Sequence, residues 1–200
     1  MSAENGEGIL QILRIRAQAA PPQLAEALGA DEAEIRAGLA KLAEQGSVRD
    51  TGDARQGWTT TRAGRRTAED RMKTLSEGSQ PQLTKAFEAF LVLDGEFEEL
   101  CADWRTRDAI KTGAAEFAPR LASIDDGARA VLEEIVPIAK HFALYAPRLA
   151  RAREKFTGGT DSYLTGLTVD SYRTIWTEWH ECFSVSLGKP GESSGASTLG

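Results

Sequence analysis

A short basic stretch offers the clearest chemistry in this sequence. Residues 56–66 read QGWTTTRAGRR, and no acidic residue occurs between positions 54 and 68. A guanidinium group donates paired hydrogen bonds to phosphate oxygens, so clustered arginines suit contact with a phosphate backbone. A run of charges is also what an ordinary solvated helix face contains, and both interpretations are open at this point. The arginines of the stretch are Arg55, Arg62, Arg65 and Arg66.

Charge is distributed unevenly along the chain. The 200 residues carry a formal net charge of -6, yet residues 1–75 hold equal numbers of basic and acidic residues. The whole negative excess therefore belongs to residues 76–200, and the basic stretch is a local feature. Local charge matters more than the sum for binding a polyanion, so the acidity of the chain does not exclude nucleic acid.

The composition is that of a globular, cytoplasmic protein. Hydrophobic residues make up 41% and charged residues 27%, which is ordinary for a folded domain. No apolar run reaches the roughly 18 to 20 residues that a membrane span needs. The first residues, MSAENGEG, do not resemble a secretory leader. Cys101 and Cys182 are expected to be reduced thiols.

Hydrophobic spacing predicts three helices in the first 46 residues. The first begins near Gly8 and ends before a Pro-Pro pair, and the second is PPQLAEALG, with proline in its first turn. The third is DEAEIRAGLAKLAEQG, for which Asp31 and Glu34 form a predicted capping box. Its buried stripe is expected to be Ile35, Leu39 and Leu42.

Two short strands and a further helix follow. SVRD and WTTT are rich in β-branched or aromatic residues and are separated by the turn segment TGDARQG. Thr61 is placed to cap the next helix, TRAGRRTAEDRMKTL. The predicted order is therefore helix, short helix, turn, helix, two-stranded ribbon and helix.

This order resembles the winged helix-turn-helix of MarR-type bacterial regulators. The resemblance lies in LAEALGADEAEIRAGLAKLAEQGSV and the following WTTTRAGRR, and it covers residues 8–75. Thr60 stands where the family pattern usually has leucine, which is a departure from it. The matching positions are Leu39, Leu42, Gly46, Val48, Thr61 and Gly64.

The resemblance implies that the chain binds double-stranded DNA. The third helix would enter the major groove, while the wing and the helix ends would hold phosphates. Arg36 would read a base edge and Lys41 would contact the backbone. The alternative is a protein-interaction module, since Glu32 and Glu34 would repel phosphate. The predicted DNA-binding residues are Arg36, Ala37, Lys41, Arg55, Arg62, Arg65 and Arg66.

The second half predicts an all-helical domain over residues 83–188, after a polar break at 76–82. A long helix is expected near 83–107 and another helical stretch near 128–156, bent or broken at Pro137 and Pro147, with a less regular connection near 110–127. A loop precedes a final amphipathic helix. The composition of residues 189–200 is typical of a disordered tail.

Aromatic residues on the predicted C-terminal helices allow two interpretations. They could form a helical core or a dimer interface, or they could line a pocket for an apolar or aromatic effector. In the second case the histidines and a tyrosine would orient the ligand. The predicted pocket residues are Trp104, His141, Tyr145, Tyr172, Trp176, Trp179 and His180.

No pattern points to catalysis, a cofactor or a metal. His180 and Cys182 would point about 200° apart on a helix, which disfavours a shared metal ion. Nucleophile-elbow, P-loop and dinucleotide-binding motifs do not occur in a suitable context. The fold is therefore expected to be mainly α, and the chain a dimeric transcriptional regulator that is not an enzyme. An accessory or adaptor protein is the alternative.

Overall fold

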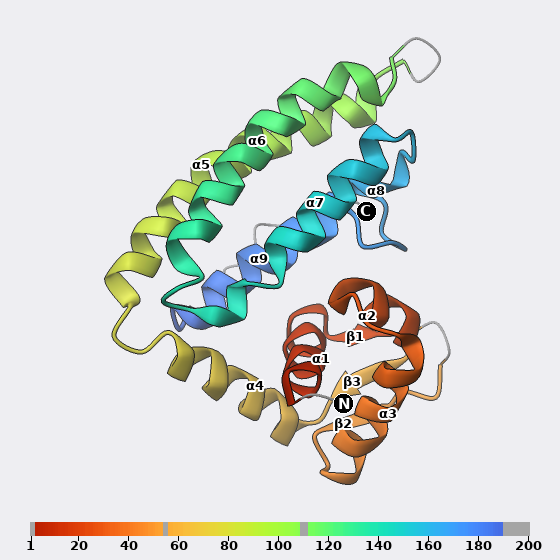
Figure 1. The fold of residues 1–200 in the computed structure, drawn as a ribbon, viewed down its shortest axis with the longest axis vertical. Helices are drawn as coiled ribbons and strands as arrows, with labels where there is room; N and C mark the ends of the chain where they lie inside the picture. Colours follow the sequence, from red (N-terminus) through yellow and green to blue (C-terminus); the bar gives the residue numbers. More distant parts are fainter. Residues whose placement is uncertain (1–2, 54–55, 109–111, 190–200) are drawn as a thin grey trace, which may run out of the picture.

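The computed structural model describes residues 3–53, 56–108 and 112–189, and this part of the chain is mainly helical (Figure 1). The N-terminal elements run from α1 to α4 and lie together at one end of the molecule. These elements are α1 (Ala3–Arg16), β1 (Gln18–Ala19), α2 (Pro21–Leu28), α3 (Glu32–Glu44), β2 (Val48–Asp50), β3 (Trp58–Thr60) and α4 (Arg62–Leu75).

The C-terminal helices run from α5 to α9. The long helices α5 and α6 form an antiparallel pair, and α7 and α9 lie between this pair and the N-terminal elements (Figure 1). These elements are α5 (Gln80–Thr106), α6 (Ala114–Ile135), the 3-10 turn η1 (Lys140–Phe142), α7 (Tyr145–Thr157), α8 (Ser162–Thr165) and α9 (Tyr172–Ser186).

A small antiparallel sheet joins the N-terminal elements. Both predicted strands form, and β3 pairs with β2 so that Arg49 lies opposite Thr59. A third strand, β1, pairs with the other edge of β3 through Gln18 and Thr59. Two residues are too short to show an alternating pattern, so the sequence did not predict β1.

Helix α4 begins at a tightly packed corner. Thr61 caps the helix as predicted, because its Oγ1 accepts a hydrogen bond from the Gly64 amide at 3.1 Å. The Thr61 amide in turn donates to the Ser47 carbonyl at 2.9 Å. A Cβ atom on Gly64 would lie 1.9 Å from that carbonyl oxygen. Gly64 is therefore needed for close approach, which gives a physical reason for one residue of the MarR-like pattern.

Some predicted local features differ in the structure. The segment expected to be irregular, 110–127, is largely helical, because α6 begins at Ala114 and continues through Pro119. Pro119 removes one backbone hydrogen bond, but Phe117 and Leu121 on either side are buried in the core. Asp31 precedes α3 without a side-chain capping bond, so the predicted capping box is wrong.

Other differences concern the last part of the chain. The predicted loop before the final helix contains α8, a single helical turn. The predicted helical stretch is broken at Pro137, which follows the end of α6, but not at Pro147, which lies in the first turn of α7. The predicted tail falls almost wholly on residues 190–200, which lie outside the described residues.

Two hydrophobic clusters lie on either side of α1 and α4. The N-terminal cluster includes Ile9, Leu13 and Leu39, and the C-terminal cluster contains the buried aromatic residues. Helix α4 contributes Ala68 to the first cluster and Met72 to the second. The two groups of elements are therefore packed against each other through shared helices, although the predicted break at 76–82 does separate α4 from α5.

Replacing Gly64 by alanine tests this packing. We expect Gly64→Ala to lower the free energy of unfolding by about 1–3 kcal/mol or more, because the added methyl group clashes with backbone. Gly95→Ala is the matched control, since a Cβ there meets nothing within 4 Å. It should be neutral or stabilising by up to about 1 kcal/mol, because Gly95 lies inside a helix. Equal urea-unfolding curves for both variants would contradict the corner geometry.

Candidate functional site

Helix α3 presents the residues predicted to read DNA on its outer face. Ile35, Leu39 and Leu42 are buried as expected. Arg36, Ala37 and Lys41 are exposed. The Arg36 side chain is 62% exposed but is held by Glu32, one turn earlier, whose Oε1 accepts from Nε at 2.9 Å. An exposed pair of this kind is worth only about 0.3–0.5 kcal/mol, so it orients Arg36 weakly.

Helix α4 begins with the predicted phosphate-binding arginines. Arg62, Arg65 and Arg66 are all exposed in its first two turns. Arg65 donates from Nε to Glu69 at 3.1 Å. Arg62 and Arg66 form no ion pair with any described residue. Arg55, in the turn between β2 and β3, lies outside the described residues.

The outer face of α3 has more acidic than basic side chains. Besides Arg36 and Lys41, it exposes a larger number of carboxylates, so this face is locally negative. The start of α4 has the opposite character, since its first turn holds arginines and no acid. Cationic contacts are therefore available mainly from α4. The exposed carboxylates are Asp31, Glu32, Glu34 and Glu44.

Five of the seven predicted pocket residues belong to the C-terminal cluster, His141 is buried against it, and His180 is half-buried. Their rings contact one another and neighbouring phenylalanines. Trp176 and Trp179 lie 4.9 and 4.7 Å from the Phe90 ring, while Trp104 packs elsewhere, against Phe156. This packing is that of a helical core, the first of the two interpretations. None of the seven residues lines the cleft that opens between the N-terminal elements and the C-terminal helices.

His141 is buried where the C-terminal helices meet α1. Its Nε2 atom lies 2.8 Å from Ser186 Oγ, and its backbone carbonyl accepts from the Gln11 side chain at 2.9 Å. Burial, helped by the nearby positive charge of Arg71, lowers the pKa of His141 to about 4. His141 is therefore a neutral part of the junction rather than an exposed ligand-binding group.

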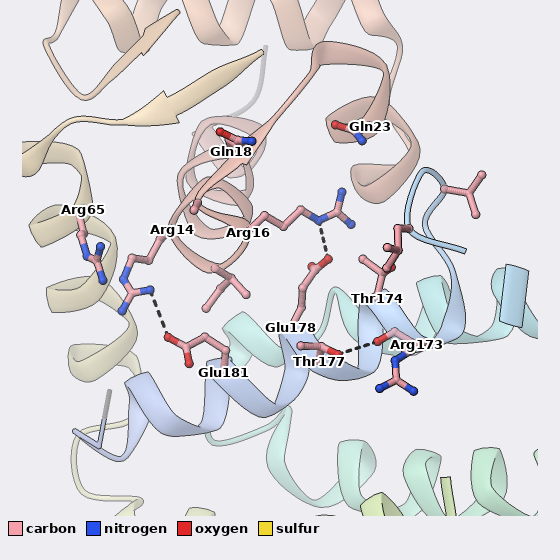
Figure 2. A pocket seen from close by; sticks show the side chains of 14 residues that line it. Arg14, Arg16, Gln18, Gln23, Arg65, Arg173, Thr174, Thr177, Glu178 and Glu181 are labelled. Carbon is pink, nitrogen blue, oxygen red and sulfur yellow. Dashed lines mark hydrogen bonds and ion pairs between the residues drawn. The ribbon is translucent and has the colours of Figure 1, made fainter. Parts of the chain in front are cut away.

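A cleft of about 820 Å³ opens between the two groups of elements. Its walls come from the end of α1, β1, the start of α2 and of α4, the segment before α9, and α9 itself (Figure 2). Its lining is mixed: Arg14 and Arg65 lie at one end with Glu181, while Ile15, Val169 and Leu167 supply apolar surface. Among the sequence-predicted site residues that the structure describes, only the predicted DNA-contact residue Arg65 lines this cleft.

A buried charge network lies beside the cleft. Arg148, only 1% exposed, donates to both carboxylate oxygens of Asp170, at 3.0 and 2.7 Å. Its Nη1 atom lies 2.9 Å from Glu178 Oε2, an ion pair without hydrogen-bond geometry. Arg16 of α1 pairs with the same two carboxylates. Two arginines and two carboxylates thus balance each other and tie α1 to α7 and α9.

Within this network, the pKa values of Asp170 and Arg148 are shifted by their partners. Burial alone would raise the pKa of Asp170, but the hydrogen bond and charge of Arg148, helped by Arg16, hold it below its ordinary value. Burial would likewise lower the pKa of Arg148, and Glu178 and Asp170 raise it above the usual range. Asp170 and Arg148 are therefore both charged near neutral pH.

A second polar contact fixes α2 against α7 and α8. Glu26 accepts from the Tyr163 hydroxyl at 2.6 Å and lies 3.3 Å from Lys155 Nζ. Arg151 donates to the backbone carbonyl of Glu26. The N-terminal elements are thus held to the C-terminal helices at both α1 and α2.

Sequence reasoning missed these junction residues. Arg14 and Arg16 end an apolar helical run, ILQILRIR, and polar residues inside such a run are one signal of a buried polar contact. The partners of Arg16, Asp170 and Glu178, follow more than 150 positions later. A single sequence holds no sign of a pairing over that distance.

Other kinds of site receive no support among the described residues. No group of three or more His, Cys, Asp or Glu there could hold a metal ion. No described helix combines the length and the apolar character of a membrane span. Cys101 and Cys182 are buried free thiols, and burial raises their pKa values to about 11 and about 12.

No protein-family model, curated protein or solved structure is significantly similar to this chain. The MarR-like resemblance therefore stays a prediction from the sequence pattern.

Removing one partner of the buried network should destabilise the protein strongly. We expect Arg148→Met to lower the free energy of unfolding by about 3–5 kcal/mol, because it leaves buried carboxylates without a counter-charge. Arg120→Met is the control, since Arg120 pairs with Asp103 at the surface. It should cost less than about 1 kcal/mol. Comparable losses in guanidinium unfolding would show that the buried network does not hold the fold.

His141 should give the protein a pH-dependent stability above the range where carboxylates titrate. The unfolded chain takes up a proton near pH 6.5, whereas the folded chain resists it until about pH 4. The contribution of His141 to the free energy of unfolding is therefore complete above pH 6.5. About 3 kcal/mol of it is lost as the pH drops towards 4. Urea unfolding at several pH values measures this slope. His141→Gln should flatten this slope, and an unchanged slope in that variant would refute the assignment.

Proposed function

We propose that this chain is a DNA-binding transcriptional regulator whose N-terminal elements form a winged helix-turn-helix. The observation that carries the proposal is the order α1-β1-α2-α3-β2-β3, with β3 paired between β1 and β2. In helix-turn-helix proteins the second helix of the motif enters the major groove while neighbouring elements hold the backbone. The matching roles here belong to α3 and to the β2–β3 wing.

Helix α3 would supply the contacts to base edges. Gly29 adopts a left-handed conformation at the end of α2, which makes the sharp turn into α3. Arg36 lies on the exposed face in the first half of α3, where helix-turn-helix proteins usually contact bases. To reach a guanine it must leave Glu32, and the weak surface pair allows this. Lys41, one turn further, suits a phosphate.

Helix α4 would supply the contacts to phosphates. Arg62 and Arg66 are exposed near its N-terminus, where backbone amides and the helix dipole also favour an anion. Phosphate contacts fix the position of a protein on the duplex without reading its sequence. The basic start of α4 is therefore expected to provide most of the salt-dependent affinity.

The C-terminal helices would bring two copies together. A dimer places two recognition helices on half-sites one helical turn apart, roughly 34–36 Å. Leu91 and Val92 are adjacent on α5 and are 43% and 67% exposed, which supplies apolar surface for such a contact. Binding of an aromatic effector among Trp176, Trp179 and their neighbours stays a prediction.

An adaptor protein is the second candidate, and the acidity of α3 favours it. With Asp31, Glu32, Glu34 and Glu44 exposed, this face would meet phosphates unfavourably and a basic protein surface favourably. In that case the same N-terminal elements would dock a protein partner. The two proposals differ in the effect of the α3 carboxylates: they would weaken binding to DNA but strengthen binding to a basic protein partner.

DNA binding by the full chain, measured on genomic fragments at several salt concentrations, tests the proposal. We expect Arg62→Ala/Arg66→Ala to weaken binding and to reduce the salt slope by about 2, because each lost phosphate contact reduces it by about 1. Glu32→Ala should tighten binding, since it frees Arg36 and removes a repelling charge.

Arg120→Ala is the matched control, because it removes an exposed arginine from α6, away from the N-terminal elements. It should leave the slope unchanged. A regulator is refuted if the wild-type chain binds no fragment at low salt. Weaker binding in Glu32→Ala would refute the placement of α3 in the groove, even where DNA binding itself is found.

A further inference from the structure

The cleft between the two groups of elements has the dimensions of a small-molecule site. Its volume of about 820 Å³ falls within the range of roughly 300–1,000 Å³ that ligand pockets occupy. It is separate from the aromatic cluster and from the exposed face of α3. A ligand here would contact α1 and α4 on one side and α9 on the other.

One end of the cleft has hydrogen-bond donors that are not fully used. Arg14 bonds Glu69 through Nε and Glu181 through Nη1, while its Nη2 atom is buried and has no hydrogen-bond partner. The Arg14 side chain is only 4% exposed. A buried guanidinium nitrogen without a partner is costly, so it suggests a group that is missing from the site.

Arg65 adds a second guanidinium group to the same end. It reaches Glu69 as well, so two arginines share one carboxylate there. Figure 2 shows Arg14 and Arg65 side by side near Glu181. Arg65 uses only Nε for Glu69, and its side chain is 59% exposed, so its remaining N–H groups can reach a ligand.

The acidic groups of the cleft are already occupied. Glu178 is bound by Arg16 and Arg148, and Glu181 and Glu69 are bound by Arg14. A cationic ligand would have to displace an arginine from one of them. An anion needs only the spare donors of Arg14 and Arg65, so the cleft favours an anion.

The backbone beside the cleft is strained. Ala17 has a φ of 66°, and among the described residues it alone combines a positive φ with a side chain. The Thr59 hydroxyl holds this conformation by donating to the Ala17 carbonyl at 2.7 Å. Such a conformation costs about 1–3 kcal/mol and is often retained at ligand sites. Here it directs the chain from α1 into β1 along the cleft wall.

We propose that the cleft binds a small organic anion, with its carboxylate or phosphate group held by Arg14 and Arg65. Its apolar part lies against Ile15 and Val169, and Leu167, 85% exposed at the edge, closes over it. The effect of this anion on DNA binding rests on the proposed function. Because Arg65 would serve both ligands, anion binding and DNA binding oppose each other by the same factor.

Four probes with the same six-carbon body test the binding site: hexanoate, hexyl phosphate, hexanol and hexylammonium. Calorimetry on the full chain without DNA should show saturable binding of hexanoate or hexyl phosphate and none of the other two. The stronger of the two anions identifies the preferred head group. Binding of neither anion, or equal binding of hexanol, overturns the proposal.

Two variants on α4 locate the anion. Arg65→Gln should weaken binding about tenfold or more, because a hydrogen bond to a charged group is lost. Lys73→Gln, an exposed cation on the same helix outside the cleft, should bind as the wild type does. Since Arg65 is exposed, its replacement should not unfold the chain. Equal affinity in the two variants overturns the site.

A competition experiment separates this inference from the proposed function. Where the chain binds DNA, saturating anion should weaken that binding in the wild type and not in Arg65→Gln. If DNA does not bind at all, the calorimetric result still decides whether the cleft binds an anion. If both ligands bind without affecting each other, the shared role of Arg65 is wrong.

Discussion

The structure depends on a small group of charges that are buried together. Arg16 and Arg148 face Asp170 and Glu178 in the space between α1, α7 and α9, where the charges would be costly if any one were unpaired. Apolar contact could have joined the same helices, but it would not select one orientation so strongly. We infer that the network sets the angle between the N-terminal elements and the C-terminal helices, because each guanidinium group must meet two carboxylates at once.

Helix α1 connects the two parts of the molecule. Its apolar face, with Ile9 and Leu13, completes the N-terminal cluster, while Gln11, Arg14 and Arg16 contact the C-terminal helices. A change at the cleft would thus act on the same helix that supports α3. In the proposed regulator this is a short physical route from a ligand to the DNA-binding face. The aromatic cluster, in which the rings fill the space between α5 and α9, gives that route a rigid base.

Charge on the exposed N-terminal surface divides between two helices. The charged residues in the first turn of α4 are all arginines, whereas the exposed charged residues of α3 are mainly acidic. For a DNA-binding protein this division favours modest sequence readout and affinity that comes largely from phosphates. For an adaptor it would favour a basic partner at α3. The arrangement of strands and helices is common to both proposals, so the decision lies with these side chains rather than with the fold.

The sequence by itself determined the mainly helical character, most helix positions and the two strands of the ribbon, because hydrophobic spacing, caps and turn residues act over a few neighbouring positions. It also singled out Gly64 and Thr61, whose roles are local. It did not reveal β1, the helical start of α6 at Ala114, or the cleft. β1 and the cleft depend on partners far away in the chain: Thr59 for Ala17, Asp170 and Glu178 for Arg16, Glu181 for Arg14. Only the tertiary structure decided them, since it alone brings such charges close enough for Coulomb attraction and hydrogen bonding to outweigh their loss of water.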